Sequence, residues 1–334
     1  QYIKNQKTKN AQSVKTLKTR HKLALTGTPI ENSLAELWSI FDFLMPQYLF
    51  NYHYFQKQYE SSIVKNNDEE KTKQLKKLVT PFILRRNKKE VLKELPDKIE
   101  QNMILPFSDE EEKIYVANLA KVNEELQQLY DIEGSDKMQI LKMLTRLRQL
   151  CLEPRLVYDN IDQPSSKLKA CMELIKTMQE NKQKVLLFSS FTSALGLIAE
   201  ECQKAGITYY MLTGSTNKEE RRELVSRFQK DDTTLFLISL KAGGTGLNLT
   251  SAENVIHYDP WWNVSAQNQA TDRAYRIGQK SNVQVFNLVM KDSVEEKIIE
   301  MQKRKKELAD MFVENNSGGL SQMSKEDILS LFTM

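Results

Sequence analysis

The 334-residue sequence has few of the residues that hold small or secreted folds together, and it contains no long apolar run. The three cysteines, Cys151, Cys171 and Cys202, form no C-x-x-C pair and are odd in number. This spacing argues against a disulfide framework and against a cysteine zinc site. The three histidines lie far apart in the sequence, so their spacing suggests no metal cage. No segment approaches the roughly 18 apolar residues of a membrane helix, and no signal-peptide pattern opens the chain. We therefore expect neither secretion nor membrane insertion, and no metal site.

The remaining composition is that of a globular protein large enough for two domains. Hydrophobic residues make up 40% and charged residues 28% of the sequence. The net charge is only +4, but it is unevenly distributed. Positions 1–22 contain several basic residues and no acidic one, and a second basic group lies at 303–306. Either group could bind nucleic acid or could be an ordinary solvated helix face. The chain begins with Gln, so we expect it to be part of a longer protein.

Apolar segments predict a parallel α/β sheet in the second half of the chain. Short, continuously apolar strands alternate with amphipathic helices from about residue 166, and such strands are typical of a sheet covered on both faces. The strands are predicted at 185–188, 209–211, 235–240, 254–258 and 283–289. Upstream, helices are predicted at 109–130 and 137–152, an extended stretch at 99–105, and a buried strand at 23–25.

The segment 259–279 carries the most informative pattern. A helix is predicted over 264–277, with Asn263 or Ser265 as its N-cap and Gly278 as its end. On that helix Gln269, Arg273 and Arg276 fall on one stripe, at i, i+4 and i+7. Two like charges one turn apart gain nothing in an isolated protein, whereas a nucleotide triphosphate would neutralise both. The alternative is that both are surface arginines paired with Asp272 or Glu253.

Glycines and hydroxyl groups follow several of the predicted strands. Gly243, Gly244 and Gly246 come directly after the strand at 235–240, where backbone N–H groups could approach phosphate oxygens. A plain tight turn is an equal alternative, since the pattern matches neither a Walker A loop nor a dinucleotide fingerprint. Ser189 and Thr192 follow another strand and could cap a helix or bind phosphate. Parallel strands would bring all these ends to one edge of the sheet.

Four segments resemble successive motifs of the Swi/Snf family of double-stranded-DNA translocases, within the second helicase superfamily. They are LTGTPIENSLAELWSIFDFLMP (25–46), VLLFSSFTS (185–193), LKAGGTGLNL (240–249) and DPWWNVSAQNQATDRAYRIGQ (259–279). Their order and spacing resemble the family over almost the whole chain. Arg-Ile-Gly-Gln at the end of the last motif differs from the Gly-Arg ending of DEAD-box RNA helicases.

The resemblance implies a role for each matching residue. Arg273 and Arg276 would be arginine fingers for the γ-phosphate of ATP, with Gly244 and Gly246 beside the nucleotide. Gln269 would sense nucleotide and link to the turn of Thr26, Gly27 and Thr28, which couples hydrolysis to movement of the lobes. Trp262 and Asn263 would connect the DNA groove to the finger helix, although the Trp261-Trp262 pair could equally serve packing. The residues that would contact the DNA backbone are Ser189, Thr192, Thr213, Lys241, Thr245 and Asn248. For Thr213 a turn hydroxyl is an equal alternative.

Two parts of the family's ATP site are missing from the sequence. The Gly-Lys-Thr phosphate loop and the paired Asp-Glu that holds Mg²⁺ do not occur, and the first residues, QYIKN, resemble the family's segment directly after that pair. The resemblance thus implies a RecA-like α/β fold with a parallel sheet flanked by helices, helical insertions and a partial first lobe. The expected divisions are a first-lobe remainder at 1–106, a helical linker at 107–165, a complete second lobe at 166–290 and a helical brace at 291–334.

The function implied is an ATP-dependent translocase on duplex DNA that displaces a DNA-bound protein complex, with the 334 residues inactive alone. ATP and Mg²⁺ would be bound mainly by the missing part of the first lobe. We expect a cytoplasmic, nucleoid-associated protein if the source is bacterial, which the lysine-rich helices weakly favour, and a nuclear one if it is eukaryotic. Two alternatives remain: an RNA helicase, and a non-catalytic helical module that docks a protein partner.

Overall fold

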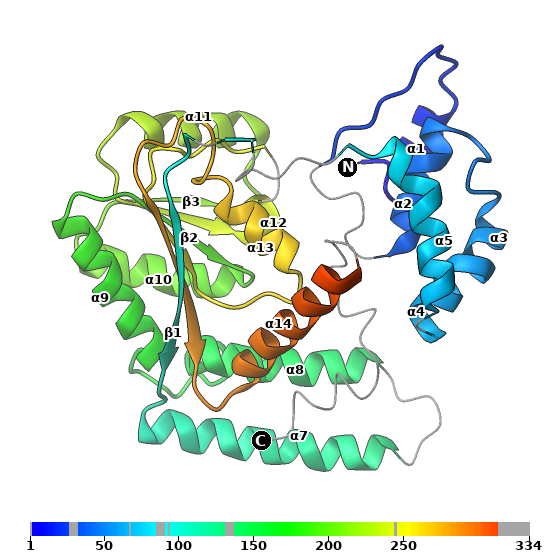
Figure 1. Cartoon of the computed structure of the whole chain (residues 1–334). Helices are drawn as coiled ribbons and strands as arrows, with labels where there is room; N and C mark the ends of the chain where they lie inside the picture. Colours follow the sequence, from blue (N-terminus) through cyan, green and yellow to red (C-terminus); the bar gives the residue numbers. More distant parts are fainter. Residues whose placement is uncertain are drawn as a thin grey trace. The chain divides into compact units, whose positions relative to one another are not determined.

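A computed structural model describes residues 2–26, 33–66, 68–84, 91–92, 94–130, 137–243 and 246–312. The chain divides into two compact units, with boundaries between Val91 and Leu92 and between Gln302 and Lys303, and residues 303–312 group with the first unit. Figure 1 shows the helices of the first unit and the sheet of the second. No helix in the described ranges is both long and apolar enough to cross a membrane.

The first unit is helical in its described part. Its elements are α1 (Lys9–Lys15), α2 (Leu34–Leu44), α3 (Tyr52–Phe55), the π-helical turn η1 (Gln56–Glu60), α4 (Ser61–Asn66), α5 (Glu69–Val79) and the 3₁₀ turn η2 (Thr80–Phe82). Its core gathers around α2, where Leu37 and Phe41 lie one turn apart on the face that packs against Phe55 and Leu75. Ser39 Oγ ties α2 to the start of the chain by donating to the Ile3 carbonyl at 2.7 Å.

The buried strand predicted at 23–25 is not formed. Leu23 and Leu25 are 81% and 85% exposed, and residues 21–26 have no regular secondary structure. A strand needs a neighbour to satisfy its backbone N–H and C=O groups. Among the described residues of this unit there is no other strand, so the apolar run has nothing to pair with.

The second unit confirms the predicted parallel sheet. Six strands, all paired in parallel, lie in the order β1-β6-β5-β2-β4-β3. They are β1 (Lys98–Leu105), β2 (Val185–Ser189), β3 (Tyr209–Leu212), β4 (Leu235–Ser239), β5 (Asn254–His257) and β6 (Val283–Met290). Every residue of β2, β4 and β5 is buried, as expected for strands covered on both faces.

Helices cover both faces of this sheet. Val185 and Leu187 of β2 point into a core shared with α9 (Ser166–Glu180) and α10 (Thr192–Lys204). Leu186 and Phe188 point into the opposite core, which includes residues of three other helices. Those helices are α11 (Lys218–Lys230), α12 (Leu240–Gly243) and α13 (Val264–Thr271). Figure 1 shows α9 and α10 apart from α11, α12 and α13, with the strands between them.

The sheet contains a strand that the sequence pattern had grouped with the first lobe. Sequence analysis placed residues 98–105 within a 1–106 domain, but β1 pairs with β6 from Lys98↔Val283 to Leu105↔Met290 and forms one edge of this sheet. The structural division accordingly falls before β1. As an edge strand, β1 is only partly covered, and Ile99 and Ile104 are 53% and 47% exposed.

Two long helices and the first part of a third complete the second unit. The predicted pair at 109–130 and 137–152 is present as α7 (Asp109–Tyr130) and α8 (Lys137–Leu152), which lie side by side in Figure 1. The 3₁₀ turn η3 (Pro154–Leu156) follows α8 and leads toward α9. After β6 the chain continues in α14 (Val294–Phe312).

Candidate functional site

The residues singled out in the sequence gather where the parallel strands end. The chain leaves β2 at Ser189, β4 at Ser239 and β5 at His257, and these ends share one edge of the sheet because the strands run the same way. The segments after β2, β4 and β5 are the hydroxyl-rich, glycine-rich and tryptophan-rich segments of the sequence. The carboxyl edge of a parallel sheet is the usual place for a ligand.

Asp259 joins two of these segments. Ser189 Oγ donates to Asp259 Oδ1 at 2.7 Å, and the Ser190 backbone N–H donates to the same oxygen at 2.9 Å. The Ser190 hydroxyl donates to Asp259 Oδ2. Asp259 is 4% exposed, so a buried carboxylate fixes the end of β2 against the segment after β5.

The predicted DNA-contacting residues fall into two groups. Ser189 is fully buried and its hydroxyl is used by Asp259, so in this structure it offers no atom to a phosphate. Thr192, Lys241 and Asn248 are exposed. Thr213 is half-buried in a turn, with its Oγ1 2.8 Å from Ser215 Oγ. The Thr213 hydroxyl therefore bonds within a turn, which was one of the two predicted alternatives, and it stays near the surface.

In the glycine-rich loop, one glycine is required by packing and another is exposed. A Cβ atom on Gly243 would lie 2.8 Å from Cε1 of Phe188, which is closer than side-chain carbons approach. Gly246 is exposed and has a φ of +53°, a conformation that favours glycine. Gly244 and Thr245 lie outside the described residues.

The helix predicted over 264–277 is shorter than expected. Asn263 caps α13 by accepting from the Ala266 N–H at 3.2 Å, but the helix ends at Thr271 and residues 272–278 form turns and bends. Beyond the helix end, the Arg273 carbonyl makes a tertiary bond, accepting from the Leu249 N–H at 2.9 Å. Arg273 and Arg276 therefore follow the helix instead of lying on it, and Gly278, at φ +101°, comes seven residues after its last residue.

Both arginines nevertheless turn toward the glycine-rich loop. Arg273 Nε donates to the Gly243 carbonyl at 3.0 Å, and Arg276 Nη1 makes a long, 3.5 Å contact with the Leu247 carbonyl. Burial and the positive charge of Arg276 lower the pKa of the Arg273 guanidinium, and Asp272 opposes them. Arginine remains charged even so. The pair thus concentrates positive charge beside the loop, where an anion would be stabilised.

The tryptophan pair and Gln269 lie at the start of the same segment. Trp262 is 5% exposed and Trp261 is half-buried, so packing, the alternative left open above, is part of their role. The Trp261 N–H donates to Gln267 Oε1 at 3.3 Å, and Gln302 of α14 donates to the Trp261 carbonyl. Gln269 is half-buried on α13.

Arg148, a residue of α8, was not predicted from the sequence as part of the site. Only 5% of this residue is exposed, and its Nη2 lies 2.7 Å from Asp259 Oδ2. The available signal was its place next to Leu147 on the face that Leu144 and Cys151 define. A charged residue on an apolar stripe is buried only when it has a partner.

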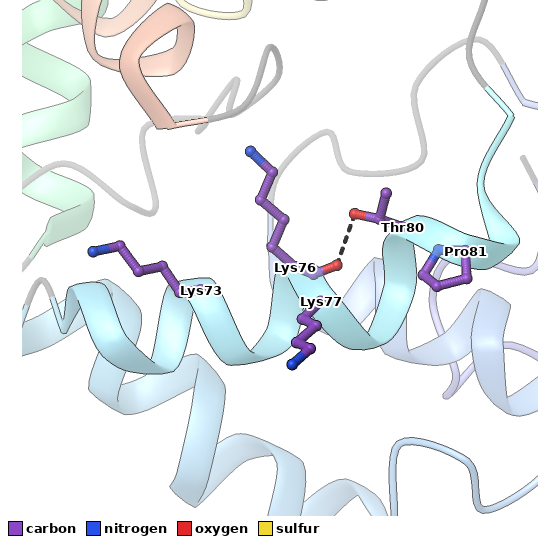
Figure 2. Close-up of a pocket in the computed structure, with 5 residues that line it drawn as sticks. All are labelled: Lys73, Lys76, Lys77, Thr80 and Pro81. Carbon is purple, nitrogen blue, oxygen red and sulfur yellow. Dashed lines mark hydrogen bonds between the residues drawn. The ribbon is translucent and has the colours of Figure 1, made fainter.

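The first unit contributes one predicted site residue to the description. Thr26 is half-buried, while Gly27 and Thr28 lie outside the described residues. A hollow of about 420 Å³ on this unit is lined by Lys73, Lys76, Lys77, Thr80 and Pro81. Figure 2 shows the three lysine side chains spread from α5, with the Thr80 hydroxyl directed at the Lys76 carbonyl. None of the predicted site residues lines this hollow.

Carboxylates suited to Mg²⁺ are not gathered in the part of the chain that the structure describes. There, no group of three or more His, Cys, Asp or Glu residues could hold a metal ion. Asp259, the carboxylate nearest to the tryptophan pair in sequence, is occupied by Arg148 and two serines. The arginine pair beside the glycine-rich loop is the feature of the described residues that suits the anion of a nucleotide.

Comparisons with known proteins cover nearly the whole chain. Residues 1–156 match the SNF2-related domain, and residues 166–278 match the helicase conserved C-terminal domain. A candidate ATP-dependent helicase/translocase of Bacillus subtilis, YwqA, is 39% identical over 100% of this chain and 37% of its own length. The ISWI chromatin-remodeling complex ATPase ISW1 of Saccharomyces cerevisiae is 33% identical over 98% of this chain and 31% of its own length. The chain thus spans about a third of the length of these curated relatives.

A solved structure supports the same assignment. The Sulfolobus solfataricus SWI2/SNF2 ATPase core in complex with dsDNA is 34% identical, with a TM-score of 0.59. The match covers 99% of this chain and 70% of that one. The RecA-like α/β fold expected from the sequence is therefore confirmed.

Proposed function

The chain belongs to the SNF2-related family of ATP-dependent helicases and translocases, and from this premise we propose that it works in a motor that moves along duplex DNA. In this proposal ATP binds beside the glycine-rich loop at the carboxyl edge of the second unit's sheet. The remaining phosphate-binding and metal-binding groups come from sequence that the 334 residues do not contain. The motor's work is to displace a protein complex from DNA.

The arginine pair is the observation that carries the proposal. Arg273 and Arg276 both reach carbonyl groups of the 243–247 segment, although the chain between them is no longer helical. The positive charge of Arg276 lowers the pKa of the Arg273 guanidinium, so the two charges repel one another. A γ-phosphate would relieve that repulsion, and guanidinium groups stabilise the charge that develops in phosphoryl transfer.

Exposed polar side chains on the same edge support contact with a DNA backbone. Thr192, Thr213, Lys241 and Asn248 follow three different strands and keep polar groups near the surface. Threonine, asparagine and lysine bind phosphate without reading base sequence. The proposed complex should therefore have little sequence preference and should weaken steeply with salt. The solved relative bound to dsDNA favours duplex DNA as the substrate.

We further propose that the chain alone does not hydrolyse ATP. Positioning of the β- and γ-phosphates and of Mg²⁺ requires a phosphate loop and acidic residues, which the sequence lacks. The DNA-bound protein that the motor displaces is unidentified. One relative is named for chromatin remodelling and another for association with the TATA-binding protein, so the relatives suggest two different classes of protein target. The proposed location is the nucleoid of a bacterial source or the nucleus of a eukaryotic one.

ATP hydrolysis by the complete enzyme, measured with duplex DNA, single-stranded DNA and RNA, tests the proposal. Stimulation by duplex DNA above the other two is the expected result. Stimulation by RNA alone would replace the proposal with an RNA helicase. No hydrolysis with any nucleic acid, together with retained binding of a protein partner, would point to a non-catalytic docking module.

A further inference from the structure

Arg148 is a buried cation that reaches from α8 to the carboxyl edge of the sheet. Its Nη2 lies 2.7 Å from Asp259 Oδ2, 3.0 Å from Ser190 Oγ and 3.3 Å from the Pro260 carbonyl oxygen. The side chains of Arg148 and Asp259 are only 6% and 1% exposed. One guanidinium nitrogen therefore holds both the segment after β2 and the segment after β5.

Three aromatic rings enclose the same guanidinium group. The distances from Arg148 Cζ to the ring centroids are 4.9 Å for Phe191, 5.3 Å for Trp261 and 5.5 Å for Trp262. Rings at such distances attract a cation through their faces. The planar guanidinium thus contacts both tryptophans while it binds the aspartate, which a lysine ammonium could not do.

Stability alone is a poor explanation for this arrangement. A buried ion pair is often replaced by apolar residues without loss of stability, because removing two charges from water offsets their attraction. Arg148 Nε is also buried without a hydrogen-bond partner, which adds a further cost. What the arrangement supplies is one defined position for the segment 259–263.

That segment sets the start of the arginine-bearing region. Trp261 is bonded through its N–H to Gln267 of α13, and Asn263 caps the same helix. The chain then runs through Gln269 to Arg273 and Arg276. A shift at residues 259–263 would therefore be transmitted to α13 and to both arginines.

We propose that Arg148 is a positioning residue: from α8 it holds the segment 259–263 in place and thereby sets the position of the two arginines beside the glycine-rich loop. This inference rests on the proposed function only in so far as the arginines act on ATP. If Arg148 has this role, α8 supports the candidate site in addition to connecting the two predicted lobes.

Hydrogen exchange and ATP hydrolysis, measured on the complete enzyme with Arg148→Met, test the inference separately. Exchange of the amides at 259–267 should rise about tenfold while β2 and β4 stay protected, because the loss is local. DNA-stimulated kcat should fall roughly tenfold or more with little change in the KM for ATP, since a misplacement of about 1 Å can cost about 100-fold in rate. The matched control is Arg146→Met, on the same helix, because Arg146 is exposed and bonds to Asn118 and Tyr158 instead. It should change neither measurement.

A second variant separates positioning from simple neutralisation of charge. Arg148→Met combined with Asp259→Asn removes both buried charges, so thermal stability should recover while exchange at 259–267 stays high. The inference would be overturned if the exchange rate at 259–267 returned to the wild-type value in the double variant, or if it were unchanged in Arg148→Met. Either result would count whether or not the enzyme hydrolyses ATP. Raised exchange with normal DNA-stimulated kcat would overturn the link to the arginines. A wild-type enzyme without DNA-stimulated hydrolysis would instead refute the proposed function, and the exchange results would still decide whether Arg148 positions the segment.

Discussion

Lys167 and Glu295 form an ion pair in which neither side chain is exposed to solvent. Lys167 Nζ lies 2.7 Å from Glu295 Oε1 and 2.6 Å from Oε2, and it also donates to the carbonyls of Tyr258 and Leu288. The Met290 N–H donates to Glu295 Oε2 at 2.9 Å. The pair therefore fastens the first turn of α9 to the first turn of α14 beneath the ends of β5 and β6.

Removing one partner of this pair should be costly. Lys167→Met leaves a buried carboxylate without its cation, so the free energy of unfolding of the second unit should fall by about 3–5 kcal/mol. Lys167→Met combined with Glu295→Leu should recover most of the loss, because no charge then remains buried. The control is Lys204→Met, whose exposed pair with Glu201 should contribute less than about 1 kcal/mol. Urea unfolding of the full chain measures all three, and a small loss in Lys167→Met would show that the carboxylate does not need its partner.

His257 should make the second unit sensitive to acid. Burial lowers the pKa of His257 from its usual 6.5 to about 4, against the opposing charges of Glu100 and Asp259. Between these values the unfolded chain binds the proton and the folded chain does not, so protonation favours unfolding. Stability is unaffected above pH 6.5 and falls as the pH drops toward 4, by up to about 3 kcal/mol.

The variant His257→Gln removes this titration. A Gln amide can still donate toward Thr271 Oγ1, which lies 2.9 Å from His257 Nε2. The melting temperature should therefore fall less between pH 6.5 and 4 in the variant than in the wild type. Equal losses in both proteins would assign the acid sensitivity to other groups.

Lys241 should contribute to DNA affinity through its charge alone. Its side chain is exposed just after β4, so we expect Lys241→Gln to weaken binding of every duplex equally. The slope of log affinity against log salt should fall by about 1. The control is Lys77→Gln, on the α5 hollow that contains no predicted site residue. Fluorescence anisotropy measures the affinity for DNA. An unchanged affinity in Lys241→Gln, or a loss of affinity for one DNA sequence only, would contradict a phosphate contact.

The sequence predicted the parts of the fold that local pattern controls. Continuous apolar runs such as Val185-Leu186-Leu187-Phe188 predicted the central strands, because a strand covered on both faces must be apolar at every position. Helical spacing of apolar residues predicted the helix pair α7 and α8, and the structure shows Asn263, one of the two predicted candidates, as the N-cap of α13. The strand pattern also brought the strand ends together, since all parallel strands end at the same edge.

Long-range pairing decided the features that the sequence did not predict. The extended stretch of β1 was expected, but its partner, β6, lies about 185 residues away, and no local pattern identifies it. The segment 23–25 is as apolar as a strand, yet the described residues of its unit provide no neighbour. The segment after α13 makes a bond from the Leu249 N–H to the Arg273 carbonyl, a contact between distant residues that the helical pattern does not predict.

The roles of the candidate site residues stay predictions, and the contacts that support these residues were not predicted from the sequence. The motif order identified Arg273 and Arg276, but Arg148 lies 111 residues before Asp259 in the sequence and belongs to none of the motifs. Ser189 was expected to meet a phosphate, whereas the structure uses its hydroxyl to hold Asp259. A hydroxyl at a strand end can bind a phosphate or a neighbouring side chain. Only the folded position of the Asp259 carboxylate shows which of the two Ser189 does.

If Arg273 and Arg276 complete an ATP site, the complete enzyme should depend on them for hydrolysis. ATP turnover stimulated by duplex DNA is measured for Arg276→Ala, with Arg222→Ala on α11 as a control of exposed charge. Arg276→Ala should lower kcat by about 10³–10⁵-fold with DNA affinity retained, and Arg222→Ala should turn over normally. Near-normal turnover by Arg276→Ala would show that the arginines do not complete the site.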